Sequence, residues 1–448
     1  MSGLCARGAS VCGAILALAL LTAAAAQAAD PAPVPLTYGG EVRLRGEAFD
    51  NPMDLDDAAD DSYQFWRLRY RLWLDARPRD GLRFHFRFGN EYRWGVHGAS
   101  LGLASVRDPE SRVSLDNGWA ELADARRGLS LRFGRMDLLY GEGFLICDGT
   151  PADGSSSAYF DAIRARLERA GCTLDLFTAK IADEGFGAPA RDEDLHGLYA
   201  QRGRYEAYAL HRCKRGATIY QAGKPWEIVS PRQWTAAFGL RVSHLPKTGW
   251  YGAAEGAYEL GEFEDAPPAE VADAPPDDHD DRRAWGAHAR AGIALKARTH
   301  PALEVGGLWL SGDDPATATY EGFDDFCGEW PKWSELLIYT LYDGTTRLEH
   351  CDEPGVVRDA GAWTNLRAVW LEGRADLAPD LKLTARGMQA WADQPAETRG
   401  LLWGLRADWT GLPGVAVQAL GEWFDPGEYF DGAGDGAWYA RCQLVAAF

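Results

Sequence analysis

Residues 63–75 read YQFWRLRYRLWLD, and two kinds of side chain alternate along this stretch. The apolar set consists of Trp66, Leu68, Tyr70, Leu72 and Leu74, and the basic set of Arg67, Arg69 and Arg71. This period-two pattern predicts a β-strand, because a helix would scatter the apolar side chains around its circumference. Unpaired arginines cannot point into a dry core. The apolar face therefore packs on a protein core, or it faces lipid while the arginines line a wet lumen.

The same alternation recurs along the chain. It is found in GEVRLRGE (40–47), LRFHFRF (82–88), FDAIRARL (160–167), LKLTAR (381–386) and WGLRAD (403–408). Each segment places apolar residues on one parity and mostly basic or polar residues on the other. The pattern predicts an all-β protein.

Turns and loops alternate in length between these segments. Short turns lie at 77–81, 124–128, 168–171, 201–203, 244–249, 298–301, 376–380 and 411–414. Longer polar stretches lie at 49–62, 95–116, 138–158, 181–194, 213–232, 261–283, 313–362, 392–398 and 425–434. A soluble sandwich mixes both kinds at both ends. Strict alternation predicts a transmembrane, antiparallel, up-and-down β-barrel of about eighteen strands, with short periplasmic turns and long extracellular loops.

The N-terminus has the layout of a secretory signal peptide. Arg7 precedes an apolar run from Val11 to Leu21, and AAAAQAAD follows. A small-x-small site at Ala26–Ala28 predicts a signal peptide at residues 1–28 and a barrel at 29–448. The apolar run is too short for a signal anchor, and no other segment reaches the ~18 apolar residues of a membrane helix. The predicted location is the bacterial outer membrane.

Acidic residues outnumber basic ones, 66 to 46, which argues against nucleic acid as a partner. Many acids fall in two long loops, with six Asp at 50–61 and nine acids at 262–281. The two loops form an acidic mouth that repels returning polymer or binds divalent cations. The alternative for the Pro-rich loop at 261–283 is that it is disordered.

Only seven of the 46 basic residues are lysine. Arginine grips carboxylates with two parallel hydrogen bonds, and rings of basic side chains select anions. If the apolar parity faces lipid, a set of arginines lines the lumen, where they attract an anionic polymer or pair with acids and hold the wall. The candidates are Arg43, Arg45, Arg67, Arg69, Arg71, Arg83, Arg87, Arg164, Arg166, Arg386 and Arg406.

The chain resembles the alginate export family of outer-membrane channels. The resemblance rests on YGGEVRLRGE (38–47), FWRLRYRLWLDARPRDGLRFHFRF (65–88), LSLRFGRMDLLYGEG (129–143), FDAIRARL (160–167) and PKWSELLIYTLYDG (331–344). It implies an eighteen-stranded, monomeric barrel with an arginine-rich constriction that passes an anionic polysaccharide. It also implies pore-region positions for Arg132, Arg135, Gly141 and Arg164.

Three functions remain open. The first is a passive outer-membrane channel for an alginate-like, uronate-rich polysaccharide, working with periplasmic export partners. The second is a general anion or sugar-acid porin that takes up oligosaccharides. The third is an outer-membrane enzyme. The third lacks a motif, because H-E-x-x-H, G-x-S-x-G and the P-loop are missing from the sequence.

We predict no catalytic residue, cofactor or metal ligand. Six cysteines follow the signal peptide, and the two that bracket a long loop, Cys327 and Cys351, are the predicted disulfide pair.

Overall fold

The structure is a computed structural model. It describes residues 34–52, 55, 62–98, 113–147, 158–183, 193–214, 217–220, 227–230, 233–263, 281–314, 316–328, 334–337, 364–430 and 435–448. The signal peptide at 1–28 and most of the acidic stretches 50–61 and 262–281 lie outside the described residues, so the predictions made for them stay predictions. Within the described part of the chain, no helix has the length and apolar character needed to cross a bilayer.

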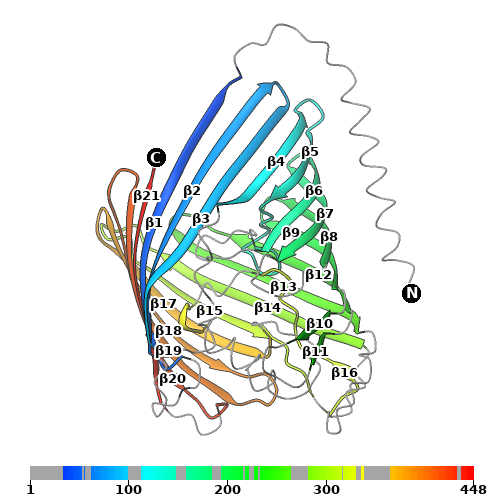
Figure 1. Cartoon of the computed structure of the whole chain (residues 1–448). Coiled ribbons are helices and arrows are strands. Elements are labelled where there is room, and N and C mark those ends of the chain that lie inside the picture. The colour runs from blue at the N-terminus through cyan, green and yellow to red at the C-terminus, as the bar shows by residue number, and fades with distance from the viewer. Residues whose placement is uncertain are drawn as a thin grey trace.

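Eighteen strands form one closed antiparallel wall (Figure 1). They are β1 (Leu36–Asp50), β2 (Tyr63–Arg79), β3 (Leu82–Gly98), β4 (Ser114–Asp124), β5 (Leu129–Met136), β6 (Ala158–Arg169), β7 (Cys172–Asp183), β8 (Glu193–Arg202), β9 (Tyr205–Lys214), β12 (Gln233–His244), β13 (Gly249–Phe263), β14 (Asp281–Ala294), β15 (Ala302–Leu310), β17 (Leu366–Ala378), β18 (Leu381–Trp391), β19 (Thr398–Leu412), β20 (Val415–Pro426) and β21 (Ala437–Ala447).

Three short strands lie outside this wall. β10 (Ala217–Tyr220) and β11 (Glu227–Ser230) form a separate hairpin between β9 and β12. β16 (Thr319–Tyr320) pairs in parallel with the start of β14. All three fall within predicted long loops, so the number of wall strands agrees with the predicted eighteen.

The first and last strands close the barrel. β1 pairs with β2 on one side and with β21 on the other, and Leu44 lies opposite both Leu68 and Leu444. Figure 1 shows β1, in blue, beside β21, in red. At the end of this seam, Gly40 and Phe448 exchange backbone hydrogen bonds of 3.1 and 3.0 Å. Closure leaves no free sheet edge, as a barrel in a bilayer requires.

The loop rhythm of the sequence is confirmed. Each predicted short turn joins two antiparallel wall neighbours, including the turn at Gln201–Gly203, which joins β8 and β9. The predicted long stretches connect strands at the opposite end of the barrel. The fold class is therefore a transmembrane-type, antiparallel, up-and-down β-barrel.

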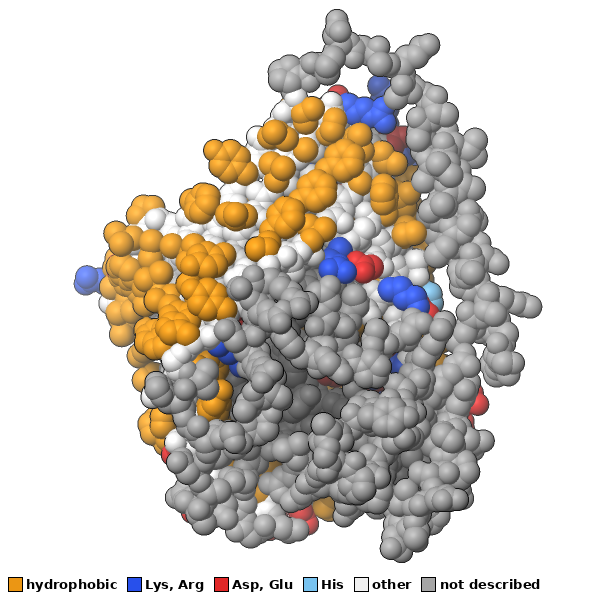
Figure 2. All heavy atoms as spheres, viewed as in Figure 1, with side chains coloured by type: hydrophobic (Ala, Val, Ile, Leu, Met, Phe, Trp, Pro, Cys, Tyr) orange, Lys and Arg blue, Asp and Glu red, His pale blue; other side chains and the backbone are white. Residues whose placement is uncertain are grey.

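The two faces of the wall differ as the opening stretch predicts. Leu72 and Phe86 are 56% and 36% exposed, whereas Arg69 is 6% exposed. Figure 2 shows hydrophobic side chains gathered over the outer face of the described strands. Trp66, Trp250 and Trp423 belong to this outer surface. Trp119 differs, because it is buried on the inner face and stacks on His85. The outer face thus suits hydrocarbon, and the arginines of the opening stretch point into the barrel.

Candidate functional site: the barrel interior

Two segments between strands fold into the barrel. One runs from residue 137 to 147 after β5, and the other from 321 to 328 before β17. They meet where Ile146 and Cys327 form a parallel bridge, with the Cys147 amide donating to the Cys327 carbonyl at 2.7 Å. Leu138, Leu145 and Phe323 from these segments are at most 2% exposed and join one apolar cluster with inner-face wall residues. The paired segments therefore fill part of the interior.

Ion pairs fix the first segment to the wall. Glu142 Oε1 accepts hydrogen bonds from Arg241 Nη2 at 3.1 Å and from Arg290 Nη2 at 2.6 Å. Gly141 next to it has a φ of 58°, and a Cβ added there would lie 3.0 Å from Arg241 Cδ. This close approach in the left-handed region favours glycine. Tyr140 adds a hydrogen bond of 3.0 Å to Asp175 on β7.

A buried carboxylate fixes the second segment. Asp324 pairs with Arg212 of β9 and, at 2.6 Å, with Arg282 of β14. Its amide donates to Glu259 at 2.9 Å. Burial by itself would raise the pKa of Asp324, but Arg212, Lys214 and Arg282 hold that pKa well below its usual range. Asp324 is therefore ionised at neutral pH.

A third described piece, residues 334–337, docks on the opposite wall. Glu422 of β20 accepts hydrogen bonds from the Ser334 hydroxyl at 3.0 Å and from the Glu335 and Leu336 amides at 2.8 Å. Arg441 of β21 donates to Glu335 at 2.6 Å. Inward segments are thus held against both sides of the barrel.

A cavity of about 400 Å³ lies between the first two segments and the wall. This volume is in the range of small-ligand cavities. Its lining combines cations, carboxylates and aromatic rings from both segments and from β14, β15, β17 and β18. The residues are Glu142, Gly143, Phe144, His288, Arg290, Glu304, Leu308, Leu310, Phe323, Asp325, Gly328, Trp370, Glu372, Arg374 and Arg386. We call this cavity the chamber.

The arginines of the chamber differ in their partners. Arg290 contacts Glu142 and, at 3.1 Å, Glu304. Arg386 donates through Nε to Glu372 at 2.9 Å. Arg374 lies with its guanidinium 5.3 Å from the Tyr251 ring centre, and no ion pair joins it to a carboxylate among the described residues. Arg374 is therefore the chamber cation that can accept an anionic guest without giving up a partner.

The predicted arginines of β1–β3 form a buried network with acids. Arg43 and Arg67 share Glu91, and Arg45 and Arg67 share Glu47. The rest of the network pairs Arg69 with Glu41, Arg71 and Arg87 with Asp116, Arg87 with Asp137, and Arg83 with Asp75. Most of these side chains are under one-fifth exposed, so carboxylates compensate much of their charge and stiffen the wall.

The other predicted arginines are spread around the inner face. Arg132 pairs with Glu121 at 2.7 Å, and Arg166 with Asp175 at 2.7 Å. Arg386 pairs with Glu372, and Arg406 with Asp408 at 3.0 Å. Arg164 lies directly opposite Arg132 in the sheet and has no carboxylate partner among the described residues. It is the member of the predicted set whose charge is least compensated.

Arg135 lies on the other side of the wall. It pairs at 2.9 Å with Asp161, which is nearly half exposed and alternates with the buried Phe160 and Ala162. The pair therefore sits on the outer face. The alternation of β5 continues without a register shift, so Arg135 shares the outer parity with the exposed Phe133, while Met136 is buried on the inner side. The expected pore position came from the family resemblance, and it does not agree with the parity of the strand.

Sequence reasoning missed several interior residues. Arg290 and Arg374 carried a usable signal, because WGAHARA (285–291) and LEGRAD (371–376) alternate like the other strands. Glu142 and Asp324 carried none, since they lie in loops whose inward course depends on tertiary contacts. The predicted Cys327–Cys351 disulfide stays a prediction, because Cys351 lies outside the described residues.

The model of a family described as alginate export matches residues 34–386. The chain belongs to the alginate export family. This membership and the barrel fold place the protein in the bacterial outer membrane as a channel-type barrel. The short turns therefore face the periplasm and the long loops the exterior. No curated protein matches the chain in sequence.

Solved structures share the fold of this family member. OccAB1 of Acinetobacter baumannii matches with a TM-score of 0.58 and 9% identity, covering 92% of this chain and 96% of its own. OccK9 (OpdG) of Pseudomonas aeruginosa gives 0.55 and 14%, with coverages of 92% and 98%. OpdK of the same organism, solved with vanillate, gives 0.51 and 12%, again with 92% and 98%.

The described residues hold no group of three or more His, Cys, Asp or Glu side chains suited to a metal ion. The described interior offers fixed guanidinium and carboxylate groups that bind charge, together with aromatic rings that contact a guest.

Proposed function

We propose that this barrel is a passive, monomeric channel for an anionic, uronate-rich polysaccharide of the alginate type. One observation carries the proposal. Arg374 lines the chamber without a carboxylate partner among the described residues, and Trp370 lies beside it in the same lining. A uronate carboxylate would give Arg374 the bidentate partner that guanidinium groups favour, while the sugar ring would contact the aromatic side chains.

The charge of the inner wall supports the same substrate. In the β1–β4 region, including the adjacent segment that starts at residue 137, the described inner-face arginines number eight and the carboxylates seven. The arginines are Arg43, Arg45, Arg67, Arg69, Arg71, Arg83, Arg87 and Arg93; the carboxylates are Glu41, Glu47, Asp75, Glu91, Asp116, Glu121 and Asp137. Arg164 adds a positive charge without a carboxylate partner among the described residues, so this part of the wall has a small net positive charge that favours anions despite the acidic composition of the whole chain.

The test is a planar-bilayer recording with uronate oligomers of defined length. We expect oligouronates to block the current and the affinity to rise with chain length. Arg374→Gln should weaken the block about tenfold, which corresponds to ~1.4 kcal/mol and the loss of one charge-assisted hydrogen bond. Arg135→Gln is the matched control, since it removes an arginine from the outer face. Equal block by a neutral oligosaccharide, or an unchanged block in Arg374→Gln, would overturn the proposal.

The size of the chamber favours one alternative, a porin for small sugar acids. About 400 Å³ accommodates one or two sugar units rather than a long chain. Swelling of proteoliposomes in isosmotic uronate solutions separates the two functions. A sugar-acid porin passes the monomer rapidly and shows no gain in affinity with oligomer length.

A further inference from the structure

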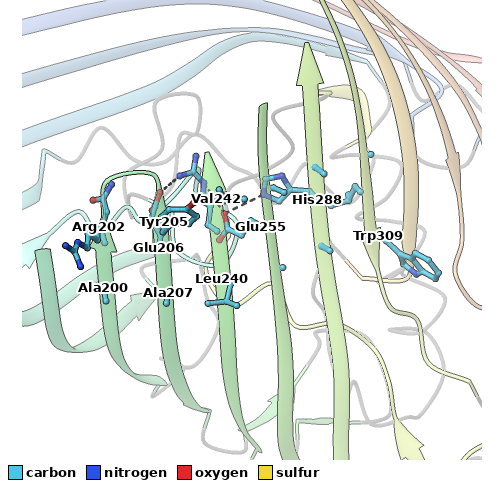
Figure 3. A pocket seen from close by; sticks show the side chains of 18 of the residues that line it. Ala200, Arg202, Tyr205, Glu206, Ala207, Leu240, Val242, Glu255, His288 and Trp309 are labelled. Atoms are coloured by element: carbon cyan, nitrogen blue, oxygen red, sulfur yellow. Dashed lines mark hydrogen bonds and ion pairs between the residues drawn. The ribbon is translucent and has the colours of Figure 1, made fainter. Parts of the chain in front are cut away.

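An apolar groove of about 1500 Å³ crosses the outer face of the barrel. Its floor consists of outward positions with little or no side chain: Ala207, Ala254, Gly256, Ala287, Ala289 and Gly307. Larger side chains such as Leu240 and Trp309, which are 70% and 41% exposed, stand beside it. Figure 3 shows these two residues along the groove, with Arg202 near its other end.

The strand register explains why the groove is continuous. Gly256 lies opposite Ala287, Ala254 lies opposite Ala289, and Ala289 lies opposite Gly307. Small residues therefore meet across three neighbouring strands. Further along the same strands the outward positions are large, with Trp250 and Leu303 toward the short-turn end. The floor is recessed by roughly the length of a side chain.

Two exposed arginines lie at the periplasmic end of the groove. Arg169 ends β6 and Arg202 ends β8, and both lie opposite Cys172 in the sheet, one on each side. No ion pair joins either guanidinium to a carboxylate among the described residues. The apolar groove in the lipid-facing wall thus begins at two arginines that form no ion pair with a described carboxylate.

We propose that this groove binds an anionic glycerophospholipid of the periplasmic leaflet. The phosphate pairs with Arg169 and Arg202, because guanidinium groups bind phosphate with two hydrogen bonds. One acyl chain lies along the recessed floor. Charge complementarity at one end and apolar surface along the rest require an occupant with both parts, and the short turns place the charged end in the periplasmic leaflet. A soluble polyanion would leave the apolar floor exposed.

Two glycines make the site testable without disturbing the wall. A Cβ at Gly256 would meet no atom closer than 3.6 Å, and one at Gly307 none closer than 3.4 Å. Leucine at both positions therefore fills the groove from outside. Gly421 on the outer face of β20 has open space within 4 Å of its added Cβ and does not line the groove, so Gly421→Leu is the matched control.

The experiment is native mass spectrometry of the full-length protein from nanodiscs of phosphatidylglycerol and phosphatidylethanolamine. Wild type should retain phosphatidylglycerol preferentially. Arg169→Gln/Arg202→Gln and Gly256→Leu/Gly307→Leu should each reduce retention at least fivefold. Gly421→Leu and Lys247→Gln/Lys296→Gln, which alter turn cations away from the groove, should retain it as wild type does. Heat-shifted gel mobility confirms that each variant is folded.

Several results would overturn the proposal. They are equal retention of the two phospholipids by wild type, wild-type retention in both groove variants, and retention of lipid A instead of phosphatidylglycerol when protein is extracted directly from outer membranes.

Discussion

Glu142 Oε1 lies 2.6 Å from Arg290 Nη2, although 148 residues separate them in sequence. This contact joins an inward segment after β5 to the inner face of β14, at the border of the chamber. The width of the passage in this part of the barrel therefore depends on how firmly one carboxylate is held.

Glu142→Gln should release this segment. The change leaves Arg241 and Arg290 without the charge they share, at a cost of about 1–3 kcal/mol. We expect a larger and noisier single-channel conductance, because the segment then moves away from the wall. Glu168→Gln removes a carboxylate at the exposed end of β6 and should leave conductance unchanged. A Glu142→Gln channel with wild-type conductance would show that the segment is held by its apolar contacts alone.

Asp324→Asn tests the second anchor and its dependence on pH. The folded-state pKa of Asp324 is below its unfolded value, so its ionised form stabilises the fold above the unfolded pKa, near 4, and this contribution is lost as pH falls through the folded pKa. Wild type should keep its apparent melting temperature from pH 7 to 4 and lose stability in stronger acid.

The Asp324→Asn variant should be less stable at neutral pH by about 3–5 kcal/mol, because Arg212 and Arg282 remain buried without their counter-charge. Its loss of stability below pH 4 should be smaller than that of wild type. Gel mobility after heating at each pH measures both effects. Parallel pH profiles for the two proteins would contradict this account of Asp324.

Gly141→Ala should alter the channel as well as its stability. The positive φ makes alanine unfavourable by about 1–2 kcal/mol, and the new methyl group also presses on Arg241. Gly203→Ala is matched in φ, at 59°, but meets nothing within 4 Å. Both variants should melt earlier, while only Gly141→Ala should change conductance in bilayers. An identical effect of the two substitutions would assign Gly141 a backbone role only.

Leu72→Arg should destabilise the barrel by about 2–4 kcal/mol, because it puts a charge on the lipid-facing surface. Leu245→Arg, in the exposed turn after β12, is the control and should cost far less. Urea unfolding in lipid vesicles measures both variants. Similar costs at the two positions would place Leu72 outside the hydrocarbon layer.

The sequence predicts the wall well because strands in a membrane obey a strict rule. Each residue of a strand faces either lipid or the interior, so the polarity of the Leu72 and Arg69 side chains is enough to predict which face each one occupies. The short turns can also be predicted from the sequence, since turn residues such as Gly203 interrupt the alternation at regular distances. Eighteen wall strands follow from these two signals.

The contacts inside the barrel are harder to predict from the sequence, for two physical reasons. Parity places Arg43 and Arg67 on the inner face but does not reveal that both contact Glu91, since that depends on cross-strand register. Glu142 and Asp324 are harder still, because their loops show no period that indicates an inward course. Arg135 is a different case, because the alternation of β5 already puts it on the outer face beside Phe133, and only the family resemblance had indicated a pore position.

The seam between β1 and β21 also bears on how the barrel is assembled. It pairs residues that are far apart along the chain, such as Leu44 and Leu444. A strand pairing of such long range forms late, because the chain between the two strands loses conformational entropy before their contacts can stabilise the barrel. Until β21 arrives, one edge of β1 has unpaired backbone N–H and C=O groups. An assembly factor that covers this edge in the bilayer would therefore set the rate at which the closed barrel forms.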